Sequence, residues 1–372
     1  MRKVKNISAL LLITACVVYL VSISNAKPFA PSLKVGVLVS DTGALAFAGP
    51  IQRAAVRLAV RDMANSAEPV KIDVSYVDAG DTEDENKVAV RKLKALDVDA
   101  IIAPIESEAA EVLARQNERN PVPIISPASL GDDLGSKESK EWLFRVATSP
   151  SQDTVALANF IAKAGHKNVL IAFGPQPQNR SQLKSLSFAL VLRGVKVQTS
   201  PIKEVKTIAK SKPNALVLLS MEESITFFGA LSDWVEQVPQ VYLVPSNLGD
   251  YSSFPWAASL KGTQALSPKI KVGASFRSDL AKVLGNQSLV GPRSTTLLAL
   301  AQKTYDSVEL VAQALLKGKN LDPERLRTAI SRVKVEGAKV FDKYGFLEQT
   351  EYSVLQYGGS GRFSQVSLFS PN

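Results

Sequence analysis

Few residues of this sequence have the side chains that nucleophilic or metal-assisted catalysis requires. The chain contains one histidine, His166, and one cysteine, Cys16, and it has no Gly-x4-Gly-Lys-Ser/Thr loop for phosphates. The single histidine and single cysteine leave almost no residues for a Ser-His-Asp or Cys-His arrangement. They are too few for a metal site of histidine and cysteine ligands. Carboxylate pairs such as Glu106 with Glu108 could serve acid–base catalysis, but neighbouring surface acids are most often solvated. We expect no catalytic residue, no metal and no cofactor.

The clearest candidate for a ligand-contacting loop lies near the N-terminus. An apolar run, Leu33–Ser40, stops at Asp41-Thr42-Gly43, and the loop closes at Gly49-Pro50. Apolar residues then recur at three- and four-residue steps, as on one face of a helix: Ile51, Ala54, Ala55, Leu58, Ala59 and Met63. A buried strand feeding a helix is the repeating unit of an open α/β sheet, where ligands bind at the carboxyl ends of the strands. The loop 41–50 is thus either a ligand contact or an ordinary connection of such a sheet.

The alternation of strand and helix continues along the chain. Further strands are expected at Val70–Asp78, Asp99–Ala103, Pro123–Ser126, Asn168–Phe173, Val195–Ser200, Asn214–Ser220, Gln240–Val244, Lys339–Phe346, Tyr352–Tyr357 and Arg362–Phe369. Further helices are expected at Thr82–Leu96, Glu106–Arg119, Gln152–Ala164, Gln182–Arg193, Val205–Lys210, Glu223–Val235 and Ser294–Leu316. Ser253–Ser267 is expected to be irregular and to cross back to the first domain. This rhythm predicts an α/β protein with two doubly wound parallel-sheet lobes.

Residues 1–26 have the composition of an export signal. Arg2, Lys3 and Lys5 precede an almost wholly apolar stretch over residues 7–23, and Ser24-Asn25-Ala26 is a small-x-small cleavage site. An alternative is lipidation at Cys16, because Leu12-Ile13-Thr14-Ala15 before it resembles a bacterial lipobox. Either form places the protein in the periplasm or cell envelope. Cleavage after Ala26 is slightly favoured, because the residues after Cys16 are apolar.

The net charge of +9 does not indicate a nucleic-acid-binding protein. Removing the leader, which has three basic residues and no acids, lowers it to +6. The densest basic cluster, within residues 203–212, has no interleaved aromatic side chains that could stack on bases. A mature chain of about 346 residues exceeds the usual size of a single core, so two domains are expected.

Several segments, taken in order behind the leader, carry a family resemblance. They are Leu33-Lys34-Val35-Gly36-Val37-Leu38, Ile125-Ser126-Pro127-Ala128-Ser129, Thr304-Tyr305-Asp306-Ser307-Val308 and Phe341-Asp342-Lys343-Tyr344-Gly345. The sequence resembles the type I periplasmic binding proteins of the leucine/isoleucine/valine-binding group, which are substrate-binding proteins of ABC transporters. This resemblance implies two α/β lobes joined by three crossovers, near Ala147–Ser149, Gly262–Ser267 and Leu347–Tyr352. Lobe 1 would comprise residues 27–148 with 266–350, and lobe 2 residues 149–265 with 351–372.

The resemblance also implies ligand contacts in the first lobe. Ser107 matches the family's serine at the start of a helix, which binds the ligand's carboxylate with help from backbone N–H groups. The alternative is that Ser107 only satisfies the helix N-terminus. Ser129 matches a polar contact, although Leu130 stands where the family has a threonine. We expect Thr42 and Phe47 to form the wall of the site.

The second lobe departs further from the family pattern. Asn179 and Asn247 are the contacts expected there. The segment Gly174–Asn179 lacks the family's tyrosine, and Val244–Leu248 lacks the acid that usually holds an ammonium group.

Two functions remain open at this point. The first is an exported monomeric solute-binding protein that captures a small polar ligand, an amino acid or amide-like molecule, for an ABC permease. The second is an envelope interaction or sensor module of the same fold, which regulates a partner without transport.

Overall fold

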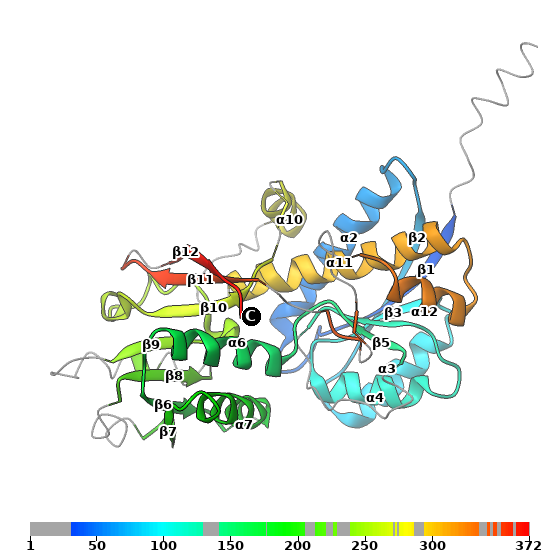
Figure 1. Cartoon of the computed structure of the whole chain (residues 1–372). Coiled ribbons are helices and arrows are strands. Elements are labelled where there is room, and N and C mark those ends of the chain that lie inside the picture. The colour runs from blue at the N-terminus through cyan, green and yellow to red at the C-terminus, as the bar shows by residue number, and fades with distance from the viewer. Residues whose placement is uncertain are drawn as a thin grey trace, which may run out of the picture.

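The computed structural model describes residues 31–128, 141–175, 177–204, 213–220, 226–228, 239–270, 272–273, 275–285, 294–334, 341–342, 345–347, 351–359 and 362–371. Within these residues the strands form two separate sheets, which lie in the two halves of the molecule in Figure 1. Helix α11 (Ser294–Gly318) runs between the two halves. We call the half that contains the first sheet lobe 1 and the other half lobe 2.

Lobe 1 is built on a parallel five-stranded sheet with the order β2-β1-β3-β4-β5. The strands are β1 (Ser32–Val39), β2 (Lys71–Asp78), β3 (Ala100–Ile102), β4 (Ile124–Ser126) and β5 (Leu143–Arg145). Parallel strands have helices on both faces and therefore need apolar side chains in both directions. The central strand β1 meets this requirement, because every residue from Val35 to Val39 is buried.

Three of the lobe 1 helices, α2, α3 and α12, begin where the sequence offers a capping residue or proline. Besides α11 they are η1 (Ala46–Ala48), α2 (Gly49–Ala64), α3 (Glu83–Lys94), α4 (Ser107–Asn117), α10 (Phe276–Leu284) and α12 (Pro323–Ser331). At α3 the Thr82 and Glu85 side chains form a reciprocal capping box. At α12 the Asp322 side chain accepts a hydrogen bond from the backbone N–H of Arg325.

Lobe 2 is built on a mixed seven-stranded sheet with the order β12-β11-β10-β9-β8-β6-β7. The strands are β6 (Asn168–Phe173), β7 (Lys196–Pro201), β8 (Ala215–Leu219), β9 (Gln240–Leu243), β10 (Gln264–Pro268), β11 (Tyr352–Tyr357) and β12 (Phe363–Phe369). In the order of the sheet, the neighbouring strands β7, β6, β8, β9 and β10 are parallel. Strand β11 is antiparallel to both β10 and β12. Its described helices are α6 (Pro150–Lys163), α7 (Pro177–Val191), η2 (Pro245–Asn247) and η3 (Ala257–Leu260).

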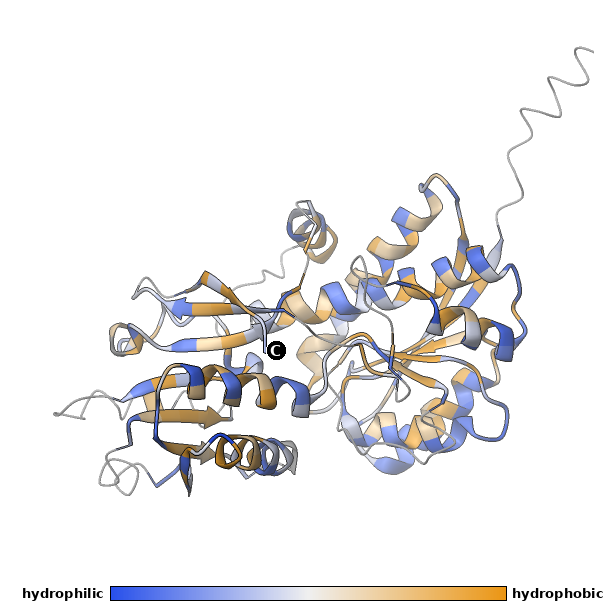
Figure 2. Ribbon diagram, in the orientation of Figure 1, coloured by the Kyte–Doolittle hydropathy of each residue, from blue (hydrophilic) through white to orange (hydrophobic). Residues whose placement is uncertain are grey.

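Both sheets are packed on both faces. In lobe 1, Val37 belongs to a core with α11 and α12, while its neighbour Leu38 belongs to a core with α3 and α4 on the opposite face. In lobe 2, Ile171 and Leu170 are divided between two cores in the same way. Figure 2 shows the result as apolar strands between helices whose polar residues face outward. Among the described residues, no helix is long and apolar enough to cross a membrane.

The structure corrects the expected position of the second crossover. The sequence pattern of Ser253–Ser267 predicts an irregular segment, and the resemblance implies a crossover near Gly262–Ser267, but Gln264–Pro268 is strand β10 of the lobe 2 sheet. Its neighbours β9 and β11 are far apart in the sequence, so this pairing has no local signal. The chain reaches lobe 1 only at α10, which packs on α2. Three elements, β5, α10 and α12, were not expected.

Other expected elements fall outside the described residues. They are Val205–Lys210, most of Glu223–Val235 and half of Lys339–Phe346. Near the other two expected crossovers, β5 ends at Arg145 before α6 begins at Pro150, and Phe346 pairs with Arg145 before β11 begins.

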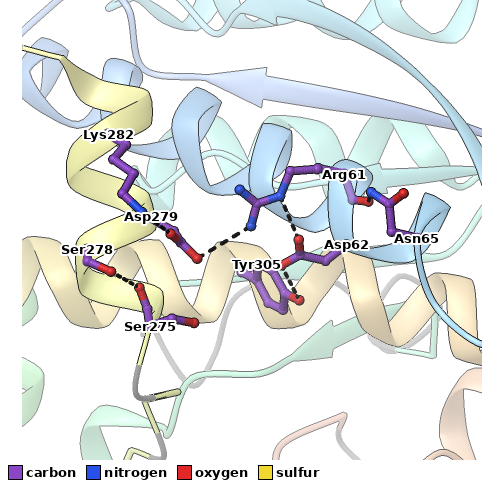
Figure 3. Close-up of polar contacts among 8 residues, drawn as sticks. All are labelled: Arg61, Asp62, Asn65, Ser275, Ser278, Asp279, Lys282 and Tyr305. Carbon is purple, nitrogen blue, oxygen red and sulfur yellow. Dashed lines mark hydrogen bonds and ion pairs between the residues drawn. The ribbon is translucent and has the colours of Figure 1, made fainter.

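Helix α11 forms hydrogen bonds with residues of both lobes. Near its start, the Thr296 hydroxyl donates to the backbone carbonyl of Leu248 in lobe 2, at 3.2 Å. Further along, the Tyr305 hydroxyl donates to Asp62 of α2, at 3.2 Å, as Figure 3 shows. Arg61 forms ion pairs with Asp62 and with Asp279 of α10. These contacts hold α2, α10 and α11 together beside the second crossover.

We predict that Gly345→Ala destabilises the fold where the third crossover passes β5. Gly345 has a φ of +74°, and a Cβ there would lie 2.0 Å from the backbone oxygen of Leu143. Left-handed backbone costs about 1–2 kcal/mol and overpacking about 1–3 kcal/mol. Gly194→Ala is the matched control, because Gly194 has a φ of +70° and nothing within 4 Å of its added Cβ.

Urea unfolding of both variants measures the difference. We expect Gly345→Ala to lose more unfolding free energy than Gly194→Ala, whose loss should be about 1–2 kcal/mol. Equal losses would show that the close approach to Leu143 has no role.

Candidate functional site

The carboxyl ends of three neighbouring strands bring together segments that are distant in the sequence. In the register of the sheet, Val39 lies opposite Asp78 and Val37 opposite Ile102. The chain leaving β1 therefore starts next to the chain leaving β2 and β3. A hydrogen bond from the backbone N–H of Ala79 to the carbonyl of Val39, at 2.8 Å, extends this pairing into the loops.

A cavity of about 600 Å³ opens at this edge, between the start of α3 and the start of α4. The residues that line it come from the loop after β2 and from α3 and α4: Gly80, Asp81, Glu83, Asn86, Glu106, Ser107, Glu108, Ala109, Glu111, Val112 and Arg115. Asn86 is buried and donates to the backbone carbonyls of Ala79 and Gly80, so it fixes the loop that forms one wall.

Ser107 lines this cavity at the first position of α4. It is exposed, and its hydroxyl has no hydrogen-bond partner among the described residues. The capping position belongs to Glu106, whose side chain makes no capping hydrogen bond. Ser107 and the backbone N–H groups of the first helical turn therefore offer donors to the cavity.

Glu106 links the cavity to the buried end of β1. The Ser40 hydroxyl, which is almost fully buried, donates to the Glu106 carboxylate at 2.6 Å. The backbone N–H of Ser40 donates to Gln52 of α2 at 3.2 Å. Burial raises the pKa of Glu106, although the hydrogen bond from Ser40 opposes this shift. The expectation that Glu106 is a solvated surface acid, like its neighbour Glu108, is therefore wrong.

The charges around the cavity are mostly negative. Five of the lining residues are acids, and Arg115, which lies 3.7 Å from Glu83, is the one lining cation. This lining favours ligand groups that donate hydrogen bonds or carry positive charge. A carboxylate at Ser107 would depend on the helix N-terminus to offset the nearby acids. Among the described residues, no cluster of three or more His, Cys, Asp or Glu side chains could hold a metal ion.

Thr42 and Phe47 lie on the loop after β1, outside the cavity lining. The Thr42 hydroxyl donates to Asp78 at 2.7 Å, and the backbone N–H of Asp41 donates to the other carboxylate oxygen at 3.1 Å. Burial acts to raise the pKa of Asp78, but these hydrogen bonds and one from Gly80 lower it overall. Phe47 lies on η1 and is 41% exposed.

The expected contacts in lobe 2 are both buried, and neither lines the cavity. Asn179 lies at the start of α7. The Asn247 amide donates to the backbone carbonyls of Ser220, at 2.7 Å, and Leu218, at 3.4 Å. Asn247 therefore holds the end of β8 in place. Ser129 and Cys16 lie outside the described residues.

We predict that Glu106→Gln changes stability in a pH-dependent way. Because burial raises the pKa of Glu106, its ionisation costs the native state more than the unfolded chain. This cost is absent below the ordinary pKa of 4.5, where both states are protonated, and is complete above the raised native pKa. We expect Glu106→Gln to unfold at higher urea concentration than the wild type at pH 7, with the difference vanishing towards pH 4.

The exposed carboxylate of Glu108, on the same helix, provides the control. Glu108→Gln should not raise the urea concentration at which the protein unfolds at pH 7. A variant Glu106→Gln that is less stable than the wild type at pH 7 would contradict the assignment of Glu106 as a desolvated carboxylate.

Comparison with known proteins agrees with this architecture. Residues 32–234 match the family described as "Periplasmic binding protein". A search of curated proteins found no match.

Solved structures share the fold at low sequence identity. A solute-binding protein of an ABC transporter from R. palustris, in complex with benzoate, has a TM-score of 0.72 at 16% identity, covering 91% of this chain and 97% of that one. A leucine-binding protein from Thermotoga maritima has a TM-score of 0.72 at 15% identity, covering 91% and 99%. A branched-chain amino acid binding protein from Streptococcus pneumoniae, in complex with isoleucine, has a TM-score of 0.68 at 18% identity, covering 91% and 100%. The match to the family spans more than half of the sequence, and the chain belongs to the periplasmic binding protein family.

Proposed function

We propose that this chain is an exported solute-binding protein that captures a small polar ligand between its lobes and delivers it to an ABC permease. The cavity at the start of α4, with Ser107 and the first-turn N–H groups facing it, is the observation that carries this proposal. Membership of the family supports a binding function without catalysis. The leader supports export, with cleavage after Ala26 or lipidation at Cys16.

The lining of the cavity favours an amino acid or amide-like ligand. Ser107 and the N-terminus of α4 would bind a carboxylate or carbonyl oxygen, and the nearby acids would accept hydrogen bonds from an ammonium or amide. The segment Val244–Leu248 lacks the acid that the resemblance implies in lobe 2. Glu106 and Asp81 supply carboxylates from lobe 1 instead. The benzoate and isoleucine of the similar structures show that this fold accepts different ligands.

Closure of the two lobes is the proposed mechanism of capture. Ligand contacts made with both lobes stabilise the closed form, and only that difference in affinity can shift the equilibrium. Lobe 1 would comprise residues 27–148 with 269–350, and lobe 2 residues 149–268 with 351–372. Thr42, Phe47 and Ser129 would extend the lobe 1 surface, and Asn179 would face it from lobe 2. The protein would act as a monomer.

An envelope sensor module is the second candidate. The absence of a tyrosine in Gly174–Asn179 and of an acid in Val244–Leu248 favours it, because both residues would hold an amino acid ligand in the family. A thermal-shift screen against amino acids, amides and small acids separates the two, since a ligand that binds only the native state raises the melting temperature. A screen without any shift would favour the sensor.

We predict that Ser107→Ala weakens binding of the ligand found in this screen by about ten- to a hundredfold. The variant removes one hydrogen bond to a charged group, worth about 1.5–3 kcal/mol. Stability should stay within about 0.5 kcal/mol of the wild type, because Ser107 does not cap α4. Ser278→Ala, which alters an exposed serine in the first turn of α10, is the control.

Calorimetric titration beside urea unfolding measures both effects. Unchanged affinity with a loss of stability of about 1 kcal/mol would return Ser107 to a purely structural role.

A further inference from the structure

One segment of lobe 2 carries positive charge without any acid. The 50 residues from Thr154 to Lys203 contain seven lysines and arginines and no aspartate or glutamate. They form most of α6 and all of β6, α7 and β7. In the described residues, none of these seven cations forms an ion pair. The charge of this segment is therefore open to a partner.

Bulky apolar side chains project from the same segment. Phe188, Val191 and Leu192, at the end of α7 and just beyond it, are 66%, 59% and 67% exposed. Among the described residues these are the three most exposed large hydrophobic side chains, and they lie within five positions of one another. Burial in a core does not account for them, so their exposure has a cost in water.

Four of the cations lie close to these apolar side chains along the chain or are bonded to neighbouring backbone. Lys184 lies one helical turn before Phe188, and Arg193 follows Leu192. The Arg193 guanidinium bonds to the carbonyl of Ala189 and to Asn159 of α6, so it spans the two helices. The backbone N–H of Lys196 donates to the carbonyl of Lys167 at 2.9 Å, which places these two lysines side by side beyond the helix. We call Phe188, Val191 and Leu192 with these four cations the α7 surface.

We propose that the α7 surface docks on the head-group region of an anionic lipid bilayer. Apolar side chains that project from a helix end, in a segment that carries cations and no acids, match that region, where anionic head groups cover an apolar interior. The core of a protein–protein interface is depleted of charged residues and of lysine in particular, whereas three lysines belong to the α7 surface. Docking through lobe 2 would hold the protein beside the membrane, and it does not depend on the bound solute.

Sedimentation with lipid vesicles tests this proposal. The chain beginning at Lys27, which contains every described element, is mixed with vesicles of phosphatidylglycerol and phosphatidylcholine in equal parts, or of phosphatidylcholine alone. We expect binding to the anionic vesicles only, and a decrease with added salt because ions screen the attraction. The double variant Phe188→Ser and Leu192→Ser should have a vesicle partition coefficient that is lower than that of the wild type by about tenfold or more. Lys184→Glu with Lys196→Glu should lower it by a similar factor.

Matched substitutions elsewhere serve as controls. Val366→Ser with Leu368→Ser changes two exposed apolar residues of β12, and Lys92→Glu with Lys261→Glu changes the net charge by the same amount. Both controls should bind vesicles as the wild type does, and circular dichroism checks that every variant is folded. Absence of binding to anionic vesicles, an equal loss in the controls, or binding only to an acidic protein would each overturn the proposal.

Discussion

The parallel pairing of β1 with β2 and β3 is the constraint on which the cavity depends. Parallel strands end at the same edge of a sheet, so the chain segments that follow them must meet there. This brings Ser40 to within 2.6 Å of Glu106, which lies 66 positions later in the sequence. A shift of one residue in β1 would turn its buried side chains to the opposite face, so the packing on both faces holds the register. The same packing therefore fixes both the fold and the geometry of the cavity.

The electrostatics of the cavity link the stability of the folded protein to the binding of a ligand in the cavity. Burial raises the pKa of Glu106, which means that its ionised form is poorly solvated in the folded protein. A cationic or donor-bearing ligand group would replace part of the lost solvation. The N-terminus of α4 beside Ser107 provides the opposite polarity a short distance away. A ligand with both an acceptor and a donor end would therefore gain from both walls.

Local patterns predicted most of the regular elements, and a long-range pairing explains why one strand was missed. Strand Asn168–Phe173 was predicted with the observed bounds, because its apolar run ends at clear breakers. Strand β10 was missed because it pairs with β11, nearly ninety residues later, and helix α12 was missed although Asp322 and Pro323 signal its start.

The site was less accessible to sequence reasoning than the fold. Ser107 was found through the family resemblance, and the structure places it in the cavity. Glu106 was expected to be a solvated acid because it neighbours Glu108, and its hydrogen-bond partner Ser40 is remote in the sequence. Asn247 was chosen as a polar loop residue, and only the folded chain shows that its amide is bonded to the end of β8.

Closure of the two lobes on a ligand is the proposed mechanism of capture, and solution X-ray scattering measures this closure. The radius of gyration of the chain beginning at Lys27 should be measured without ligand and with a saturating concentration of a ligand that raises the melting temperature. Capture between the lobes predicts a smaller radius of gyration in the bound state. An unchanged radius of gyration at a saturating ligand concentration would show that the lobes do not close on the ligand.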